Sequence, residues 1–326
     1  MSTVFVTGAS GHIGPILVRK LLERGDTVRA LIYAGDETGI ADLPIEKIPG
    51  DLFDNEALKK GMAGADVVYH LAARISIVGP EGGLVHKINV EGVRNVARIA
   101  LESGVKRFVH FSSIHAFKQE PKDVPFDETR TLCDASNYAY DYSKAQGIGV
   151  IREFVEKGLH AVIVNPGGVI GPMDWHPSRM GHVWLDLYHG KLPGVVDGGF
   201  TWVDARDVVD GAMAAETKGR PGECYLLTGE YHKVIDLVHM AEKVTGKRMT
   251  HMETPMWLAR LVAPFALWFA LLFKMTPLFT PESLGALRGH PDVRHDKATN
   301  ELGFAPRPVA ESIKDIYAWF KEQNML

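Results

Sequence analysis

The sequence predicts an α/β protein built on a doubly wound, mainly parallel sheet, with a smaller and mostly helical second domain. Short β-rich runs alternate with helical runs from residue 3 to residue 166. The strand runs are nearly continuous apolar stretches, as expected for strands covered on both faces. After Pro166 the alternation weakens, glycine and proline become frequent, and aromatic residues cluster in DWHPSRMGHVWLDLYHG. Repeated β–α alternation is typical of the doubly wound fold.

The apolar runs place the elements of the first half in order. We expect strands at TVFVT (3–7), TVRALIY (27–33), the weaker IEKIPGD (45–51), DVVYHLA (66–72), RFVHFSS (107–113) and HAVIVNP (160–166). Helices are expected near 12–24, 55–62, 84–103 and 139–157. The β–α rhythm returns at FTWVDARDVVDGAMAA and ECYLLTG. We therefore predict a sheet domain of residues 1–166 and 199–230, and a second domain of residues 167–198 and 231–326.

Composition and charge exclude several classes of protein. A hydrophobic content of 46% and a charged content of 23% fit a globular chain of 326 residues with a large core. The net charge of −4 gives no sign of nucleic-acid binding. Two cysteines and an N-terminus without a signal-peptide pattern fit a reducing, cytoplasmic location. His176, His182 and His189 have no acidic partner at metal-ligand spacing, so no metal site is expected.

One apolar segment, residues 257–273, invites comparison with a membrane helix. Its uncharged run from Leu261 to Phe273 has 13 residues, is interrupted by Pro264, and lies between Arg260 and Lys274. A bilayer span needs about 20 apolar residues, so no transmembrane span is expected. We expect a helix that covers a substrate pocket or a dimer face, with contact to a membrane surface as the second interpretation.

A glycine-rich turn, TGASGHIG, follows the first predicted strand and opens the first helix. It contains Gly8, Gly11 and Gly14. Glycine permits the tight turn, the close approach of backbone to a pyrophosphate, and close packing of the helix on the sheet. The helix N-terminus adds free N–H groups and partial positive charge. The spacing, G-x-x-G-x-x-G, differs from the most familiar fingerprint, but its context predicts a dinucleotide site.

The end of the second strand bears on the choice between NAD and NADP. An acidic residue there binds the ribose 2′-hydroxyl, and a basic one pairs with a 2′-phosphate. The sequence has Tyr33 at this point, with Asp36 and Glu37 slightly later. Tyr33 either packs on the adenine or is an exposed aromatic. Because a 2′-phosphate would lack its usual partner, NAD is preferred to NADP.

The stretch NYAYDYSKAQG raises the question of whether one of its three tyrosines has a chemical role. Residues four apart lie on one face of a helix, and Tyr140 and Lys144 have that spacing. Tyr138 and Tyr142 lie off that face. A cation beside a phenol lowers its pKa, so we expect Lys144 to tune Tyr140 as a proton donor and acceptor near neutral pH.

With these motifs in place, the chain resembles the extended short-chain dehydrogenase/reductase superfamily, the NAD-dependent epimerase/dehydratase family, over nearly its whole length. Within it the chain looks most like the dihydroflavonol reductase and 3β-hydroxysteroid dehydrogenase group. GDL (50–52), HLAA (70–73), NVEGVRN with Asn89, FSS (111–113) and NPGGVIGP (165–172) support the likeness. It implies a Rossmann domain that binds NAD(P), a substrate domain and a homodimer built through helices of the sheet domain. The implied cofactor-binding residues are Gly8, Gly11, His12, Ile13, Gly14, Tyr33, Asp51, Leu52, Leu71, Ala72, Ala73, Ser112, Tyr140, Lys144, Pro166, Gly167 and Val169.

The resemblance also assigns catalytic roles. Tyr140 would exchange a proton with a carbonyl or alcohol oxygen, and Lys144 would lower its pKa and hydrogen-bond the nicotinamide ribose. A serine hydroxyl should polarise the same oxygen. Neighbouring strand residues point to opposite faces, so only one of Ser112 and Ser113 can aim at the substrate. Counting back from Phe117, where the family commonly has tyrosine, the resemblance gives the catalytic place to Ser113. His115 is a candidate substrate contact, with a satisfied strand-end histidine as the alternative, whereas Asn89 is expected to tie the sheet together.

Two functions compete at this stage. The first is interconversion of a carbonyl and an alcohol on a bulky apolar substrate, such as a flavonoid-like, steroid-like or aldehyde compound. The second is a nucleotide-sugar epimerase or dehydratase with tightly bound NAD. A sugar nucleotide calls for a cationic clamp, and Arg179, Lys191, Lys247 and Arg248 form no obvious one. The apolar 257–273 segment favours the first function, and the serine, tyrosine and lysine set disfavours a cofactor-binding protein without catalysis.

Overall fold

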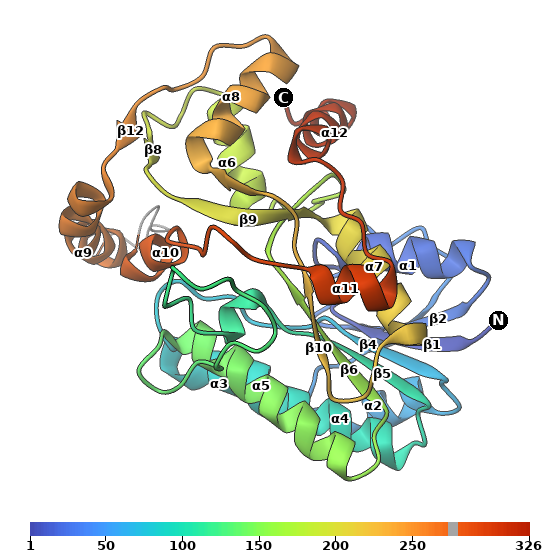
Figure 1. Ribbon diagram of the computed structural model, residues 1–326. Helices are drawn as coiled ribbons and strands as arrows, with labels where there is room; N and C mark the ends of the chain where they lie inside the picture. Colours follow the sequence, from blue (N-terminus) through green and yellow to red (C-terminus); the bar gives the residue numbers. More distant parts are fainter. Residues whose placement is uncertain (273–279) are drawn as a thin grey trace.

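A seven-stranded parallel sheet lies at the centre of the molecule (Figure 1). The structure is a computed structural model that describes residues 1–272 and 280–326. The sheet has the order β10-β6-β5-β4-β1-β2-β3, with β1 (Thr3–Thr7), β2 (Thr27–Ile32), β3 (Glu46–Pro49), β4 (Val67–His70), β5 (Arg107–Phe111), β6 (Ala161–Pro166) and β10 (Cys224–Leu227). The predicted doubly wound parallel fold is confirmed. The strand order reverses between β1 and β4, which opens a crevice at the carboxyl ends of these strands.

Helices cover both faces of this sheet, as the apolar strands require. One face carries α2 (Asn55–Met62), α4 (Val93–Glu102) and α5 (Ala139–Glu156), and the other carries α1 (Gly14–Glu23), α7 (Ala205–Lys218) and α11 (Asp296–Leu302) (Figure 1). Every residue of β4, β5 and β6 is buried. Two apolar cores therefore form, one on each side of the sheet.

The predicted helix over 84–103 is present, but its first part is not a regular α-helix. A 3₁₀ turn (Glu81–Gly83) leads into α3 (Leu84–His86), a π-helical stretch (Lys87–Gly92) and then α4. The amide of Asn89 accepts from the backbone N–H of Arg74 at 2.8 Å and donates to Ser143 Oγ at 2.9 Å. A π-turn widens the helix locally. Here it turns Asn89 inward, where its amide joins the chain after β4 to α5.

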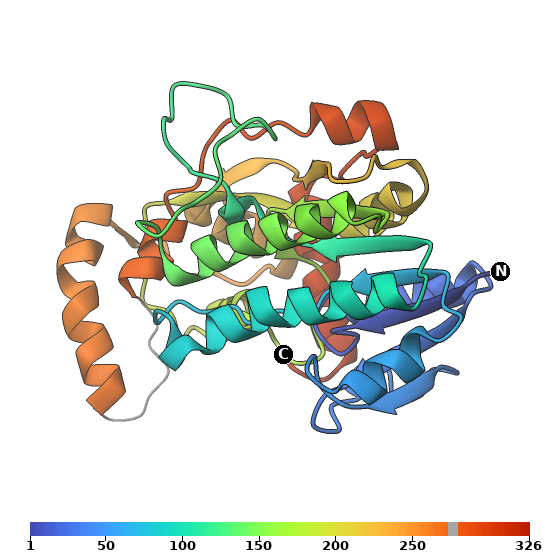
Figure 2. The same ribbon diagram turned by 90° about the horizontal axis from the view of Figure 1, so that it is seen from below.

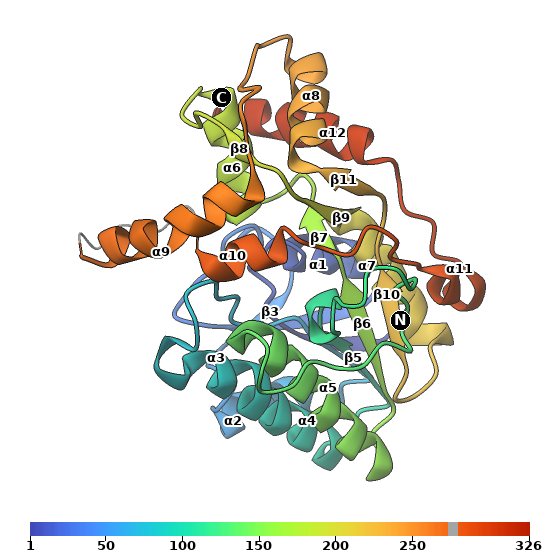
Figure 3. The same cartoon turned by 60° about the vertical axis from the view of Figure 1, so that its left-hand side comes forward.

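The rest of the chain builds a second, smaller layer above the sheet (Figure 3). Its strands are β7 (Gly168–Ile170), β9 (Gly199–Asp204) and β11 (Tyr231–Lys233) in one sheet, and β8 (Val195–Val196) paired with β12 (Glu253–Thr254). Its helices are α6 (Arg179–Tyr188), α8 (Val234–Thr245), α9 (Met256–Leu272), α10 (Pro281–Ala286) and α12 (Val309–Glu322). The predicted 199–230 segment is divided between the two sheets. Strand β10 belongs to the large sheet and α7 packs on it, whereas β9 pairs in the small sheet. The division into two domains stays a prediction.

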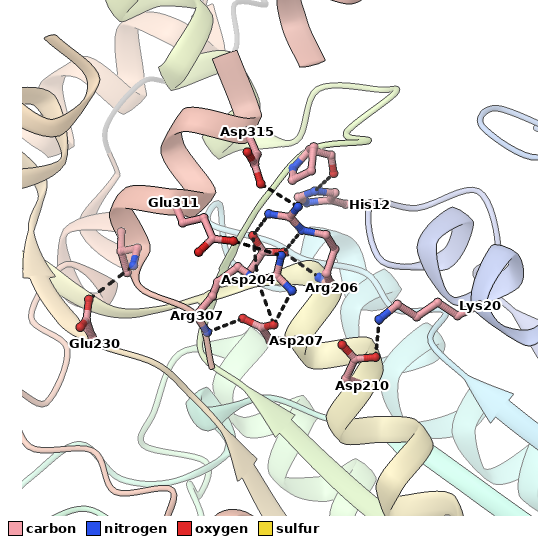
Figure 4. A network of polar contacts seen from close by, with 12 residues as sticks. His12, Lys20, Asp204, Arg206, Asp207, Asp210, Glu230, Arg307, Glu311 and Asp315 are labelled. Atoms are coloured by element: carbon pink, nitrogen blue, oxygen red, sulfur yellow. Dashed lines mark hydrogen bonds and ion pairs between the residues drawn. The ribbon is translucent and has the colours of Figure 1, made fainter. Parts of the chain in front are cut away.

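A network of charged residues connects the C-terminal helix, α12, to helix α7, which packs on the large sheet (Figure 4). Asp204 caps α7 by accepting from the backbone N–H of Arg206 at 2.8 Å. The Arg206 guanidinium binds Asp204 and, at 2.7 Å, Asp315 on α12. Arg307, just before α12, donates to Asp207 through its side chain at 2.8 Å and its backbone N–H at 2.8 Å. These contacts fix α12 against the start of α7.

Helix α9 projects from the body of the molecule (Figures 2 and 3). Its inner side packs Met256, Ala259 and Ala263 on Val196 and Leu284. None of the helices in residues 1–272 and 280–326 is long and apolar enough to cross a bilayer. The last residue of the predicted 257–273 segment lies outside the described residues. The predicted helix is thus present over Met256–Leu272.

Candidate active site

The glycine loop lies at the point where the strand order reverses. Gly8 follows β1 with φ = 76°, and a Cβ added there would lie 2.6 Å from the backbone N of Ala72, beyond β4. A Cβ on Gly14 would lie 2.4 Å from the carbonyl oxygens of Gly8 and Ala9, whereas a Cβ on Gly11 would approach nothing closer than 3.6 Å. Helix α1 begins at Gly14 with no acidic side chain in its first turn. The crowded backbone and the open helix end fit a dinucleotide pyrophosphate.

The predicted adenosine end is more open. Tyr33 directly follows β2 and is 70% exposed. The carboxylate of Asp51 accepts from the backbone N–H groups of Phe53 at 2.7 Å and Asp54 at 3.0 Å, so it stabilises the turn before α2. Leu52 is buried in the core against Gly92. The structure therefore leaves the Tyr33 ring free at this edge of the sheet and gives Leu52 a packing role.

The end of β4 faces the glycine loop. His70 Nδ1 lies 2.7 Å from Thr7 Oγ1, and the His70 ring stacks on His110 with centroids 5.5 Å apart. Burial, and then the nearby charge of Lys144, lower the pKa of His70 to about 3, so its ring is neutral. Leu71 and Ala72 are partly buried and Ala73 is exposed. The backbone after β4 therefore forms the wall opposite Gly8.

The remaining predicted cofactor residues lie within the glycine loop and in the segment that follows β6. His12 Nε2 lies 3.3 Å from the carbonyl oxygen of Pro172, which links the loop to the segment after β7. Ile13 is partly buried and packs on the core beneath α1. Gly167 follows Pro166, the last residue of β6, and a Cβ there would lie 2.4 Å from the carbonyl oxygen of Thr201. In β7, Val169 pairs with Val203.

Tyr140 and Lys144 lie one turn apart on α5, as their spacing predicts. Lys144 is buried, and its Nζ donates to the carbonyl oxygen of Phe111 at 2.9 Å. Burial lowers the pKa of Lys144 to about 8. The expected lowering of the Tyr140 pKa by Lys144 is wrong for this structure. Burial raises the pKa of Tyr140 well above its usual value; a contact with Ser113 lowers it in part, and Asp141 raises it further.

The two candidate serines point to different partners. Ser113 Oγ accepts from the backbone N–H of His115 at 3.2 Å and contacts the Tyr140 hydroxyl. Ser112 Oγ instead donates to the backbone carbonyl of Lys144 at 3.5 Å. The Tyr138 hydroxyl is engaged elsewhere, since it donates to the carbonyl oxygen of Pro281 at 3.2 Å. The structure thus brings Ser113, Tyr140 and Lys144 together at the end of β5.

His115 lies beside this cluster with two partners that the sequence prediction left out. Its Nδ1 is 3.3 Å from a carboxylate oxygen of Asp141. Its ring meets the rings of Tyr140 and Phe200 edge-on, with centroids 6.1 Å and 6.3 Å away. Asp141 was adjacent to the predicted tyrosine, so helix geometry could have pointed to it, but Phe200 comes from β9 and only the fold brings it here. Among the described residues, no group of three or more potential ligands is placed to hold a metal ion.

The chain is similar to known proteins over its whole length. The model of the NAD dependent epimerase/dehydratase family matches residues 4–227. Sterol demethylase protein B of Methylococcus capsulatus is 34% identical, with 99% of this chain and all of that protein aligned. A putative dihydroflavonol 4-reductase of Synechocystis sp. is 29% identical over 98% of this chain and 95% of its own length. The crystal structure of gox2253 is 34% identical, covers all of both chains and superimposes with a TM-score of 0.86.

These matches confirm the predicted resemblance and the nicotinamide cofactor, which the family description gives as NAD. They also support oxidoreductase chemistry, because reductases are among the relatives. The chain therefore belongs to the NAD dependent epimerase/dehydratase family and is an NAD-dependent enzyme of the extended short-chain dehydrogenase/reductase type.

Proposed function

We propose that this enzyme interconverts a carbonyl and an alcohol on a bulky apolar substrate, with Tyr140 as the acid and base. The observation that carries the proposal is the meeting of Ser113, Tyr140 and Lys144 at the end of β5. This cluster lies on the same edge of the sheet as the glycine loop. A proton donor beside a dinucleotide site is the arrangement that carbonyl reduction requires.

The residues that would hold NAD surround the crevice between β1 and β4. Gly8, Gly11 and Gly14 would admit the pyrophosphate to the start of α1, and Tyr33 would pack on the adenine. The backbone of 71–73 and the turn at 166–169 would line the ribose and nicotinamide, with His12, Ile13, Asp51, Leu52, Ser112, Tyr140 and Lys144 completing the predicted set. When bound, NAD accepts or supplies the hydride. Use of NADP in its place is disfavoured by the exposed Tyr33, which offers no cation.

The side chains then divide the proton chemistry between them. The phenol of Tyr140, whose pKa burial raises, is protonated at neutral pH and can donate to a carbonyl oxygen. Lys144, one turn away, would hydrogen-bond the nicotinamide ribose, as the resemblance implies. Ser113 would donate a second hydrogen bond to the same oxygen. In the reverse direction, Tyr140 takes the proton of an alcohol.

Two further observations support an apolar substrate. The relatives reported above include proteins named for a sterol and for a dihydroflavonol, both bulky ring compounds. One of the cations considered for a sugar-nucleotide clamp already has another partner, because Lys247 Nζ lies 4.0 Å from the centroid of the Tyr188 ring. A nucleotide-sugar epimerase remains the alternative that the experiment below must separate.

The test follows the absorbance of NADH in the presence of purified protein. A panel of steroid and aromatic ketones would be compared with a panel of nucleotide sugars. We expect NADH oxidation with at least one ketone and a loss of kcat of about a hundredfold or more in Tyr140→Phe. Tyr138→Phe is the matched control, because its hydroxyl contacts Pro281 and not the cluster, and it should keep full activity. Conversion of a sugar nucleotide to its epimer without net NADH change would refute the reductase.

A further inference from the structure

One polar side chain interrupts an otherwise apolar strand beside the proposed proton chemistry. Asn165 is the fifth of the six residues of β6, and its exposed fraction is 0%. Because side chains alternate between the faces of a strand, Asn165 lies on the same face as Ile163 and beside Leu226, its partner on β10. Both neighbours belong to the apolar core on the α5 side of the sheet. A buried amide at this position needs an explanation.

The amide of Asn165 reaches the proposed catalytic serine. Pairing of β5 with β6 ends where the backbone N–H of Ser112 donates to the carbonyl oxygen of Val164 at 2.8 Å. Ser113 lies one residue beyond, and Asn165 Nδ2 donates to its carbonyl oxygen at 3.1 Å. Asn165 therefore extends the contact between the two strands to Ser113.

The same carbonyl oxygen belongs to the turn that holds the Ser113 hydroxyl. It accepts from the backbone N–H of Ala116 at 3.1 Å, and Ser113 Oγ accepts from the N–H of His115 at 3.2 Å. These two bonds close a single 3₁₀ turn, Ile114–Ala116, and so short a turn has little rigidity of its own. Because Asn165 holds the carbonyl from a buried strand, it also fixes the place of the hydroxyl beside Tyr140.

The oxygen of this amide, Asn165 Oδ1, has no hydrogen-bond partner within residues 1–272 and 280–326, although it is buried. An unpaired buried oxygen destabilises a folded protein, whereas an apolar side chain of the same shape does not. Removal of the amide would still leave the Ser113 carbonyl bound to the N–H of Ala116. Stability therefore does not explain why asparagine occupies this position.

We propose that Asn165 is a positioning residue of the carbonyl reduction and acts through Ser113. Its Nδ2 holds the Ser113 carbonyl, so that the hydroxyl points at the oxygen that Tyr140 serves. The inference rests on the function proposed above and adds to it a residue outside the catalytic cluster. Loss of the amide should lower the rate of reduction without lowering the stability of the protein.

The first experiment measures the turn without any turnover. NAD-free protein labelled with ¹⁵N-histidine would be studied by NMR, and His115→Asn would identify the backbone amide signal of His115, which reports on the Ser113 hydroxyl. In Asn165→Leu this signal should shift, and its hydrogen exchange should be about tenfold faster, the value of one hydrogen bond. Asn165→Ala should behave alike and replaces the leucine variant if that one folds poorly. An unchanged signal would overturn the inference.

Thr228→Val is the matched control for this experiment. Thr228 directly follows β10 and is fully buried, and its hydroxyl has no partner among the described residues. Its replacement by valine removes an unpaired oxygen but no bond to Ser113. We expect the His115 signal to stay as in the wild type. A change equal to that in Asn165→Leu would reject positioning by the Asn165 amide.

The second experiment separates positioning from a purely structural role. With the ketone that the wild type reduces fastest in the panel above, Asn165→Leu should lower kcat about tenfold and leave KM within about twofold. The midpoint of thermal unfolding should stay equal or rise. In a Ser113→Ala background, Asn165→Leu should lower kcat no further, because both changes remove the same contribution. A lowered midpoint, or losses of kcat that multiply, would reject the proposal.

The two proposals fail in different ways. Loss of turnover in Tyr140→Phe, together with a His115 amide signal that Asn165→Leu does not change, would keep the reductase and reject the role of Asn165. Activity that survives in Tyr140→Phe would reject the reductase mechanism itself.

Discussion

Lys144 is a buried cation whose ionisation the fold changes. Burial lowers its pKa from 10.5 to about 8, so between these values the unfolded chain holds a proton that the folded protein has lost. The free energy of unfolding should therefore rise with pH through this window, and the cost of the buried charge is fully present below pH 8. That cost corresponds to about 3 kcal/mol. Lys144→Met should be more stable than the wild type at pH 7 by an amount of this order.

Urea denaturation of the NAD-free protein at pH 7 and pH 9.5 measures the effect. The difference between the two proteins should shrink at the higher pH, because the wild-type lysine is then neutral when folded. A variant that is less stable at both pH values would contradict the assignment of a buried, destabilised charge.

Alanine substitutions at Gly8 and Gly11 should have different effects on stability, although the two residues lie three positions apart in one loop. Gly8 has a left-handed backbone, and a methyl group there would collide with the backbone of Ala72. Gly8→Ala should lower the free energy of unfolding by about 2 kcal/mol and weaken NAD binding. Gly11→Ala meets only the carbonyl oxygen of Gly8, at an ordinary contact distance of 3.6 Å, and should change stability by less than about 1 kcal/mol. Thermal unfolding with and without NAD gives both quantities, and equal losses in the two variants would refute this account.

For single residues, the sequence predicts that Tyr140 and Lys144 lie close together, but it does not predict their pKa values. The spacing of Tyr140 and Lys144 is a property of one helix, so it could be read directly. The raised pKa of Tyr140 comes from burial beneath the rest of the fold, which a local pattern does not contain. Phe200 was also out of reach, because β9 joins the site only through long-range packing.

Among the elements, α9 has an exposed apolar stripe that calls for a partner. Trp257, Leu261 and Phe265 follow one another at intervals of one turn and are 69%, 61% and 70% exposed. We propose that this stripe lies on a membrane surface, where a helix too short to span can bury one face. The wild type should sediment with phosphatidylcholine vesicles containing phosphatidylglycerol. Replacing all three residues by serine should reduce binding about a hundredfold or more, given about 1.5 kcal/mol or more for each buried side chain.

The control for α9 is Val244→Ser, which removes an exposed apolar residue from α8 and should leave vesicle binding unchanged. Wild-type protein that stays in the supernatant would reject the membrane contact and favour a dimer face.

The positions of most strands and helices were predicted correctly, because both follow from apolar periodicity. The π-helical stretch at 87–92 was not, since it depends on Asn89 contacts with residues 15 and 54 positions away.

For the whole molecule, the repeated β–α alternation of the sequence predicts the doubly wound topology. It does not predict how copies of the chain assemble into an oligomer. The likeness to the family suggests a homodimer built through helices of the sheet domain, and α4 and α5 are two of the helices that cover the large sheet. Helices α4 and α5 lie side by side on one face (Figure 2), joined by Arg94 and Glu153 at 2.6 Å. Midway along α5, a Cβ added to Gly149 would contact nothing.

We therefore propose that α4 and α5 form the dimer interface, and Gly149 gives a direct test. Arginine at this position has room in a single chain, but an interface would bury its charge without a partner, at a cost of several kcal/mol. Gly149→Arg should change a dimer into a folded monomer at micromolar concentration, as seen by sedimentation velocity. Gly149→Ala should remain dimeric and gain up to about 1 kcal/mol of stability, because alanine is the better helix former. A Gly149→Arg protein that stays dimeric would place the interface on another face.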